Sequence, residues 1–256
     1  MSTTKSFFPP MPKTGINFPD SPLLQASLEH SRKYTNLSTV NHCLRSASFA
    51  FLLSRRHPAL KVLDLDMELI VYSALMHDLG WSPDQEFISA DKRFEVDGAN
   101  LARQFLVESP LKSTEWNKHR LQLSWDAIAL HATPSIAFHK EPEVLALALG
   151  ISADFLSRDP PFTQLITDEE HREIVEAFPR VNFTQNFVDI MCRLCREKPE
   201  TTFDNMVGGF GCVYGTDGKG TGKEEFAKKL NDSLAANVFS GSLARCAAVE
   251  DREQRS

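Results

Sequence analysis

The sequence Met-His-Asp-Leu-Gly-Trp at residues 76–81 decides the fold, because it ends an apolar segment with two polar side chains. Residues 69–75 are apolar enough to form a buried helix, so His77 and Asp78 should reach the interior. An unpaired buried polar group costs ~1–3 kcal/mol, and a charge costs more. Gly80 is typical of a helix end. We therefore expect buried partners for His77 and Asp78, and a shared metal ion would satisfy both.

The composition describes a protein with a sizeable core and no electrostatic attraction for nucleic acid. Of 256 residues, 42% are hydrophobic, and the net charge is -6. No basic stripe marks a nucleic-acid surface, and no apolar run approaches the ~20 residues of a membrane span. Five Cys without a secretory leader favour a cytoplasmic protein. A small-molecule substrate is the expected partner, and the Phe-rich stretch at 7–18 would suit a homo-oligomer.

Helical periodicity runs through most of the chain, and no segment alternates at period two. The predicted helices cover residues 23–33, 38–56, 66–77, 94–108, 114–133, 144–156, 168–178, 182–197 and 224–239. Ser38, Asp66 and Thr167 are the predicted N-caps, and Thr167 begins a capping box. The fold class is therefore predicted to be all-α.

The chain is predicted to form one domain with an extension at each end. Residues 1–20 are rich in Pro and should form an extended arm. Residues 21–240 form the single helical domain, and residues 241–256 form a charged, frayed tail. Glycines at 208–222 indicate a loop, since their spacing does not fit a phosphate-binding loop. Cys192 and Cys195 lack a second ligand pair and are predicted to be buried small residues.

Two further side chains of the metal-binding type lie on apolar helices. His42 stands near the border of the apolar stripe of its helix, and Asp154 ends the apolar run at 144–153. Alone, each is more often a locally satisfied polar residue. Together with His77 and Asp78, they supply two imidazoles and two carboxylates, which can coordinate Zn²⁺ or Fe²⁺ and leave room for water.

The order His42, His77-Asp78, Asp154 resembles the HD domain superfamily of metal-dependent hydrolases and lyases, over roughly residues 37–159. This resemblance implies an HD-type helical bundle with additional C-terminal helices. It also implies that these four residues bind one divalent metal ion, with Zn²⁺ expected first and Fe²⁺ second.

Within the superfamily, the chain is most similar to fungal cyanamide hydratase-type proteins, on the residues at 94–100, 131–134, 150–154 and 198–201. That likeness implies the addition of water to a small nitrile, with cyanamide giving urea. Trp81 stands where phosphodiesterase members have a Lys. Phe94 stands where binuclear members have a His for a second metal. Both differences favour a small neutral substrate and a single metal.

The implied reaction needs groups that handle protons, because the nitrile nitrogen must be protonated as water adds. Asp78 is expected to orient the water, and His131, at a helix end, is the first candidate for substrate contact or proton delivery. Asp97 is the second candidate. The alternatives are a capping role for His131, and for Asp97 an ordinary helix position or an ion pair with Arg45.

Two other functions stay open at this point. One is an HD-type phosphohydrolase acting on a nucleotide or another phosphate ester, with Lys92, Arg93 or Lys140 supplying positive charge. The other is a non-catalytic metal-binding HD protein. Trp81, Phe94 and Phe138 are predicted to line the pocket.

Overall fold

The computed structural model describes residues 8–111, 116–156, 160–235 and 238–254. These residues form helices joined by loops, with no β-strand among them, which confirms the all-α prediction. They fall into two compact units, residues 1–183 and 184–256. The sequence predicts one domain over residues 21–240, whereas the structure divides that range after Phe183.

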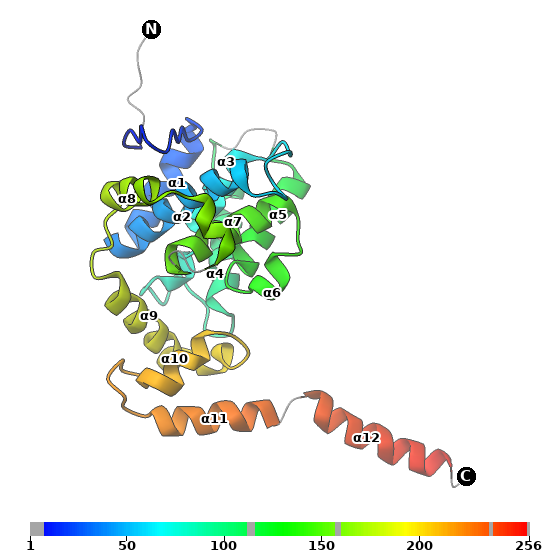
Figure 1. Cartoon of the computed structure of the whole chain (residues 1–256). Coiled ribbons are helices and arrows are strands. Elements are labelled where there is room, and N and C mark those ends of the chain that lie inside the picture. The colour runs from blue at the N-terminus through cyan, green and yellow to red at the C-terminus, as the bar shows by residue number, and fades with distance from the viewer. Residues whose placement is uncertain (1–7, 112–115, 157–159, 236–237, 255–256) are drawn as a thin grey trace. The chain divides into compact units, whose positions relative to one another are not determined.

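The first unit contains the following elements, of which Figure 1 labels the α-helices: α1 (Pro22–Tyr34), α2 (Leu37–Arg56), α3 (Met67–Met76), η1 (Leu79–Trp81), α4 (Phe94–Glu108), α5 (Lys118–Leu130), α6 (Pro134–Ala137), α7 (Pro142–Leu156), η2 (Pro161–Leu165) and α8 (Asp168–Ala177). The second unit contains most of α9 (Phe183–Glu197), then η3 (Pro199–Thr202), α10 (Val207–Tyr214), α11 (Lys223–Ala235) and α12 (Val238–Glu253).

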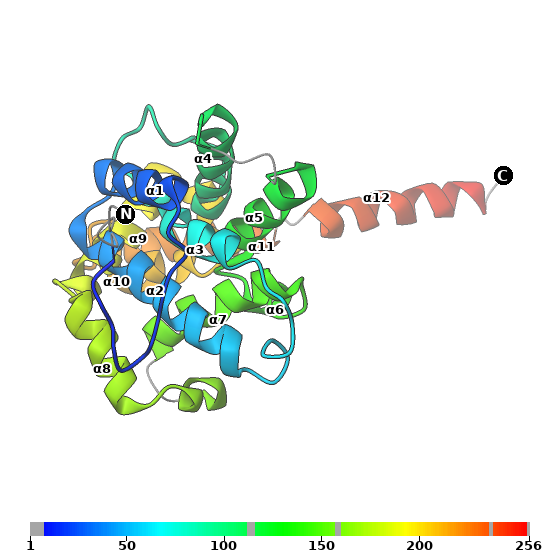
Figure 2. The same cartoon turned by 90° about the horizontal axis from the view of Figure 1, so that it is seen from above.

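The packing of α7 along α2 is the most extensive helix contact of the first unit, and Figure 2 shows the two helices side by side. Gly150 permits the close approach. A Cβ atom there would lie 2.5 Å from the carbonyl oxygen of Ser46 and 2.6 Å from Ala50 Cβ. This pair of helices brings residues 42 and 154, far apart in sequence, to the same region.

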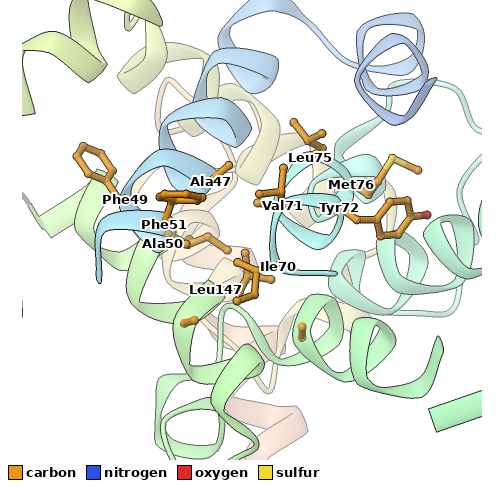
Figure 3. Packing of buried hydrophobic residues seen from close by; sticks show 14 of the residues in the cluster. Ala47, Phe49, Ala50, Phe51, Ile70, Val71, Tyr72, Leu75, Met76 and Leu147 are labelled. Atoms are coloured by element: carbon orange, nitrogen blue, oxygen red, sulfur yellow. The ribbon is translucent and has the colours of Figure 1, made fainter. Parts of the chain in front are cut away.

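A continuous hydrophobic core fills the space between α2, α3 and α7. Ala50, Ile70 and Leu147 come from these three helices, all at 0% exposure, and Figure 3 shows them among their neighbours. Because α3 is apolar on all sides, its C-terminal end lies inside the unit. That end carries His77.

The capping residues agree only partly with the sequence. The Asp66 side chain accepts a hydrogen bond from the Leu69 amide, and Thr167 forms its capping box with Glu170, as predicted. The prediction for Ser38 is wrong: Asn36 caps α2 by accepting from the Thr39 amide. Asn36 and Ser38 are both good N-caps, so local sequence does not choose between them.

Residues 8–20 lie against the first unit. Phe8, Met11 and Phe18 are buried in its core. The amides of Lys13 and Thr14 donate to the Glu173 carboxylate of α8 over 2.9 and 2.7 Å. The arm therefore contributes to the core of this unit.

The glycine-rich segment departs from its prediction, because residues 207–214 form α10 and not a loop. Added Cβ atoms would collide with neighbours: that of Gly208 would lie 2.6 Å from the Thr202 oxygen, and that of Gly211 would overlap the Phe226 ring. These glycines permit close packing. Predicted loop structure is present at 215–222, where Gly215 has a φ of +69°.

The tail and the cysteines complete the second unit. The prediction of a frayed tail is wrong for residues 241–253, which belong to α12 and are rich in good helix formers. The predicted helix at 224–239 ends with α11 at Ala235, and residues 236–237 lie outside the described part. Cys192 and Cys195 are free and buried, as predicted.

Candidate metal centre

The His77-Asp78 pair lies in a tight turn between α3 and η1, held against the start of α4. A Cβ atom on Gly80 would overlap the carbonyl oxygen of Phe94, and one on Gly98 would lie 2.7 Å from the His77 carbonyl oxygen. Only glycine fits such close backbone approaches. The two glycines therefore fix the direction in which the His77 and Asp78 side chains enter the core.

The structure brings His42, His77 and Asp78 together in one fully buried cluster. His77 Nε2 lies 3.1 Å from Asp78 Oδ2 and 3.3 Å from His42 Nε2. His42 Nε2 lies 3.6 Å from the same Asp78 oxygen. Three atoms of the metal-ligating type thus surround one point, with one contributed by each residue.

Hydrogen bonds at the other ring nitrogens settle which tautomers the two histidines adopt. His77 Nδ1 donates to the Ala74 carbonyl oxygen over 2.8 Å, and His42 Nδ1 donates to Asp154 Oδ2 over 2.7 Å. A carbonyl oxygen and a carboxylate only accept, so both Nδ1 atoms carry the proton. When the two rings are neutral, both Nε2 atoms present lone pairs to the cluster, which is the state that binds a metal.

Asp78 supplies the strongest evidence that a cation belongs here. Both of its carboxylate oxygens are buried, and neither accepts a well-formed hydrogen bond from the described residues. A buried carboxylate in that condition is costly. A divalent cation between Asp78 and the two imidazoles would remove that cost, so the residues fit the metal.

Burial and neighbouring charge set the proton affinities of the cluster. Burial lowers the pKa of His42. Burial also opposes charge on His77 and Asp78, but their mutual attraction outweighs it, raising the pKa of His77 and lowering that of Asp78. Asp78 is therefore ionised at neutral pH and carries the negative charge of the cluster.

His131 faces the cluster from the end of α5. Its Nδ1 donates to the Ile128 carbonyl oxygen over 2.6 Å, and its Nε2 lies 3.8 Å from Asp78 Oδ1. Burial, followed by the nearby His77, lowers the pKa of His131 to about 3. His131 is therefore neutral at physiological pH, with its Nε2 lone pair directed towards the site.

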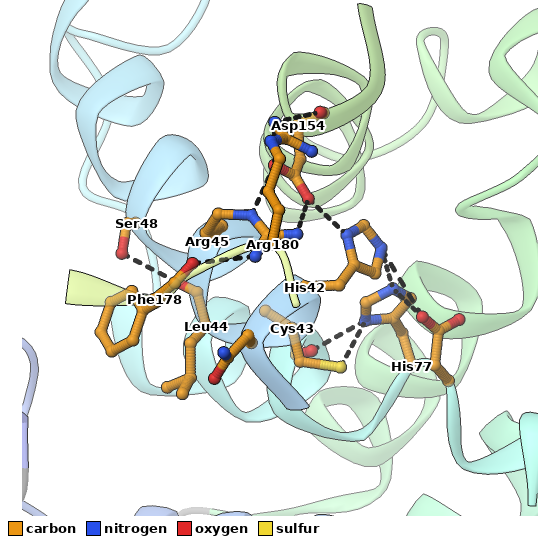
Figure 4. A network of polar contacts seen from close by, with 12 residues as sticks. His42, Cys43, Leu44, Arg45, Ser48, His77, Asp154, Phe178 and Arg180 are labelled. Atoms are coloured by element: carbon orange, nitrogen blue, oxygen red, sulfur yellow. Dashed lines mark hydrogen bonds and ion pairs between the residues drawn. The ribbon is translucent and has the colours of Figure 1, made fainter. Parts of the chain in front are cut away.

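Asp154 lies next to His42, on the side away from His77. Its carboxylate accepts from His42 Nδ1, from Arg45 Nε and Nη2 over 2.8 and 2.9 Å, and from Arg180 Nη2 over 2.8 Å. Figure 4 shows the three side chains converging on it. Its predicted role as a metal ligand stays a prediction.

Asp97, the second catalytic candidate, lies in the first turns of α4 and accepts a hydrogen bond over 2.7 Å from the hydroxyl of Ser89, which belongs to the preceding loop. The alternative that Asp97 forms an ion pair with Arg45 is wrong, since Arg45 forms its ion pair with Asp154. A catalytic role for Asp97 stays a prediction.

Aromatic rings surround the His42 side of the site. The ring of His42 lies 5.0 Å from that of Phe155, 5.1 Å from Phe183 and 6.0 Å from Trp81. Phe94 lies 5.6 Å from His131. Trp81 and Phe94 are two of the residues that the sequence predicted to line the substrate pocket.

Other residues around the site were missed or assigned differently. The sequence pattern did not indicate Phe155 and Phe183, although Phe155 directly follows Asp154. It also gave no indication that Arg45 and Arg180 bind Asp154. The position of Arg45 could have been used as a signal, because it follows His42 by three residues and residues three apart lie on the same face of a helix. Phe138, predicted for the wall, packs against the hydrophobic core.

Fold and site together define an all-helical protein with a candidate mononuclear metal centre of two histidines and an aspartate. Residues 39–154 match the family model of the HD domain. Proteins of this family bind divalent metals and are usually metal-dependent hydrolases. A search of curated proteins found no relative of the chain. Within the described residues, no helix has both the length and the apolar character for crossing a bilayer.

Proposed function

We propose that this protein is a metal-dependent hydratase that adds water to a small nitrile and converts cyanamide to urea. His42, His77 and Asp78 would hold the metal, with Asp154 as the expected fourth ligand. The observation that carries the proposal is the buried Asp78 carboxylate, which accepts no well-formed hydrogen bond from the described residues and lies against the Nε2 atoms of two imidazoles. The likeness to cyanamide hydratase-type proteins supplies the substrate.

The donor set suits the proposed metal. A divalent ion, when bound, supplies Lewis acidity and lowers the pKa of a water molecule from 15.7 to about 7. The two imidazoles and the carboxylates of Asp78 and Asp154 can coordinate Zn²⁺ or Fe²⁺ and leave room for water. We propose Zn²⁺, and elemental analysis separates the two metals.

The surroundings of the site support a neutral substrate. Trp81 and Phe155 offer aromatic faces beside His42. The nearby cations Arg45 and Arg180 are both bound to Asp154. The cations that sequence analysis named as sources of charge are paired with acids, as follows: Lys92 with Asp91, Arg93 with Glu95 and Lys140 with Asp126. A dianionic phosphate would have to compete with these carboxylates.

His131 and Asp78 are the residues that we propose to handle water and protons. A water molecule that contacts Asp78 Oδ1 would also lie near the His131 Nε2 lone pair. As the water oxygen bonds to the nitrile carbon, one carbon–nitrogen π bond breaks and its electrons move to nitrogen. Neutral His131 can accept a hydrogen bond from that water at Nε2 and help to pass the water proton to that nitrogen. The resulting isourea tautomerises to urea.

A phosphohydrolase is the second candidate, because proteins of the HD family, whose model matches residues 39–154, are usually hydrolases. A non-catalytic metal-binding protein is the third. Both share the metal site with the leading proposal and differ in the chemistry that it serves.

Urea formation from cyanamide, measured with the metal-loaded and the chelator-treated protein, tests the proposal. Release of phosphate from p-nitrophenyl phosphate and a nucleoside monophosphate is measured on the same samples. We expect urea formation that disappears with chelator and in His77→Ala, and no phosphate release. Phosphate release without urea would favour the second candidate. Inactivity on all substrates with metal bound would favour the third.

We also propose a cytoplasmic location and a small-molecule partner. The five cysteines are free, which supports a reducing compartment. The homo-oligomer stays a prediction.

A further inference from the structure

The side chains at the centre of the site are closed off from solvent. His42, His77 and Asp78 are each at most 1% exposed. A water molecule outside the protein therefore has almost no contact with them, and a nitrile is larger than water. Entry of a substrate thus requires a neighbouring side chain to move.

Aromatic rings pack around the imidazole of His42, and they differ sharply in exposure. Trp81 and Phe183 are 5% and 8% exposed, whereas Phe155 is 41% exposed. The Phe155 ring meets that of His42 edge to face, with 5.0 Å between the ring centroids, and lies 5.3 Å from that of Phe183. Phe155 therefore lies between His42 and solvent.

The place of Phe155 in the fold makes its ring easier to displace than the other two. Phe155 is the last residue but one of α7, which ends at Leu156. Exposed side chains change rotamer within picoseconds to nanoseconds. Movement of a buried ring such as that of Trp81 or Phe183 would instead disturb a close-packed interior. Rotation of Phe155 is thus the least costly way to open a path to His42.

We propose that Phe155 is a specificity-determining residue that acts as the gate of the site. Its ring closes the path from solvent to His42, and its rotation admits a substrate. Displacement of one ring opens only a narrow passage, so the gate favours molecules as small as cyanamide over nitriles with bulkier substituents. For the identity of the substrate, the proposal rests on the proposed function. The position of the gate rests on the packing around His42 alone.

Modification with diethyl pyrocarbonate, which acylates accessible neutral imidazoles, tests the gate without metal or catalysis. The metal-free proteins are wild type, Phe155→Ala, Phe155→Trp and Leu156→Ala. Leu156→Ala is the matched control, because it shortens a neighbouring side chain that is 48% exposed. The rate of modification of His42 is measured by mass spectrometry of its peptide, with the exposed His119 as the internal reference.

We expect His42 to react several-fold faster in Phe155→Ala, more slowly in Phe155→Trp, and at the wild-type rate in Leu156→Ala. Opposite effects of a smaller and a larger side chain are the mark of a gate. Equal rates in all four proteins would overturn the proposal. Faster reaction in both Phe155 variants would also overturn it, since that result indicates loosened packing.

Substrate size gives the second test, with the metal-loaded proteins. The ratio of kcat/KM for dimethylcyanamide, which gives dimethylurea, to that for cyanamide should rise by about 10-fold in Phe155→Ala, an effect typical of size discrimination in an apolar site. It should not change in Leu156→Ala. An unchanged ratio in Phe155→Ala would contradict the role in specificity. If the wild type formed no urea while His42 modification followed the expected order, the proposed function would fail and the gate would stand.

Discussion

In this site, residues of the same type differ in their surroundings, which is true of the two aspartates and of the three histidines. Asp78 is buried without a well-formed hydrogen bond from the described residues, whereas Asp154 accepts four. His42 and His77 present Nε2 to a common point, and His131 presents Nε2 to Asp78 from another helix. Residue type alone does not assign these roles; the partner on the far side of each group does.

His131→Gln is expected to lower the rate constant for urea formation by about 10²–10⁴-fold, the usual contribution of a proton-transferring group. Metal content should not change, because the triad of His42, His77 and Asp78 stays intact. The measurement is kcat with cyanamide, combined with elemental analysis. His119→Gln, an exposed histidine on the same helix, is the control. Full activity of His131→Gln would contradict the role, and loss of metal would place His131 among the ligands.

At the scale of elements, the contact between α2 and α7 holds the site together, because α2 carries His42 and Arg45 while α7 carries Asp154. Gly150 allows the helices to approach so closely. Glycines also permit close packing at the turn that carries His77, where Gly80 and Gly98 lie directly against neighbouring backbone atoms. Close backbone packing thus sets the distances between the functional side chains.

Gly150→Ala should lower the free energy of unfolding by about 1–3 kcal/mol, as overpacking of a tight core usually does. The added methyl group would push α7 away from Ser46 and Ala50. Urea denaturation measures the change. Ser152→Ala, at a half-buried position on the same helix, is the control and should stay within about 0.5 kcal/mol of wild type. Equal stability of Gly150→Ala and wild type would contradict the packing argument.

At the scale of the molecule, the sequence predicted the fold class and most helices of the first unit. Helix α4 has the predicted bounds of 94–108, and α7 ends at Leu156 as expected. Apolar periodicity and local caps decide such elements. The predicted helix at 114–133 is shorter, since α5 runs from Lys118 to Leu130, and residues 112–115 lie outside the described part.

Other features depend on contacts between segments distant in sequence, which periodicity does not contain. The glycines of α10 indicated a loop, although Gly211 is needed where Phe226 packs. The division after Phe183 has no marker in the composition. The sequence motif predicted that His42, His77 and Asp78 lie together, as they do in the structure. It gave no indication that Arg180 forms an ion pair with Asp154.

The metal content of the purified protein tests the central claim most directly. Wild type, His42→Ala, His77→Ala and the control His119→Ala are purified without chelator and measured by elemental analysis. We expect about one equivalent of a divalent metal in the wild type and the control, as for a mononuclear site, and a small fraction of that in the other two. A wild type without metal, or a full equivalent retained by His77→Ala, would contradict the account.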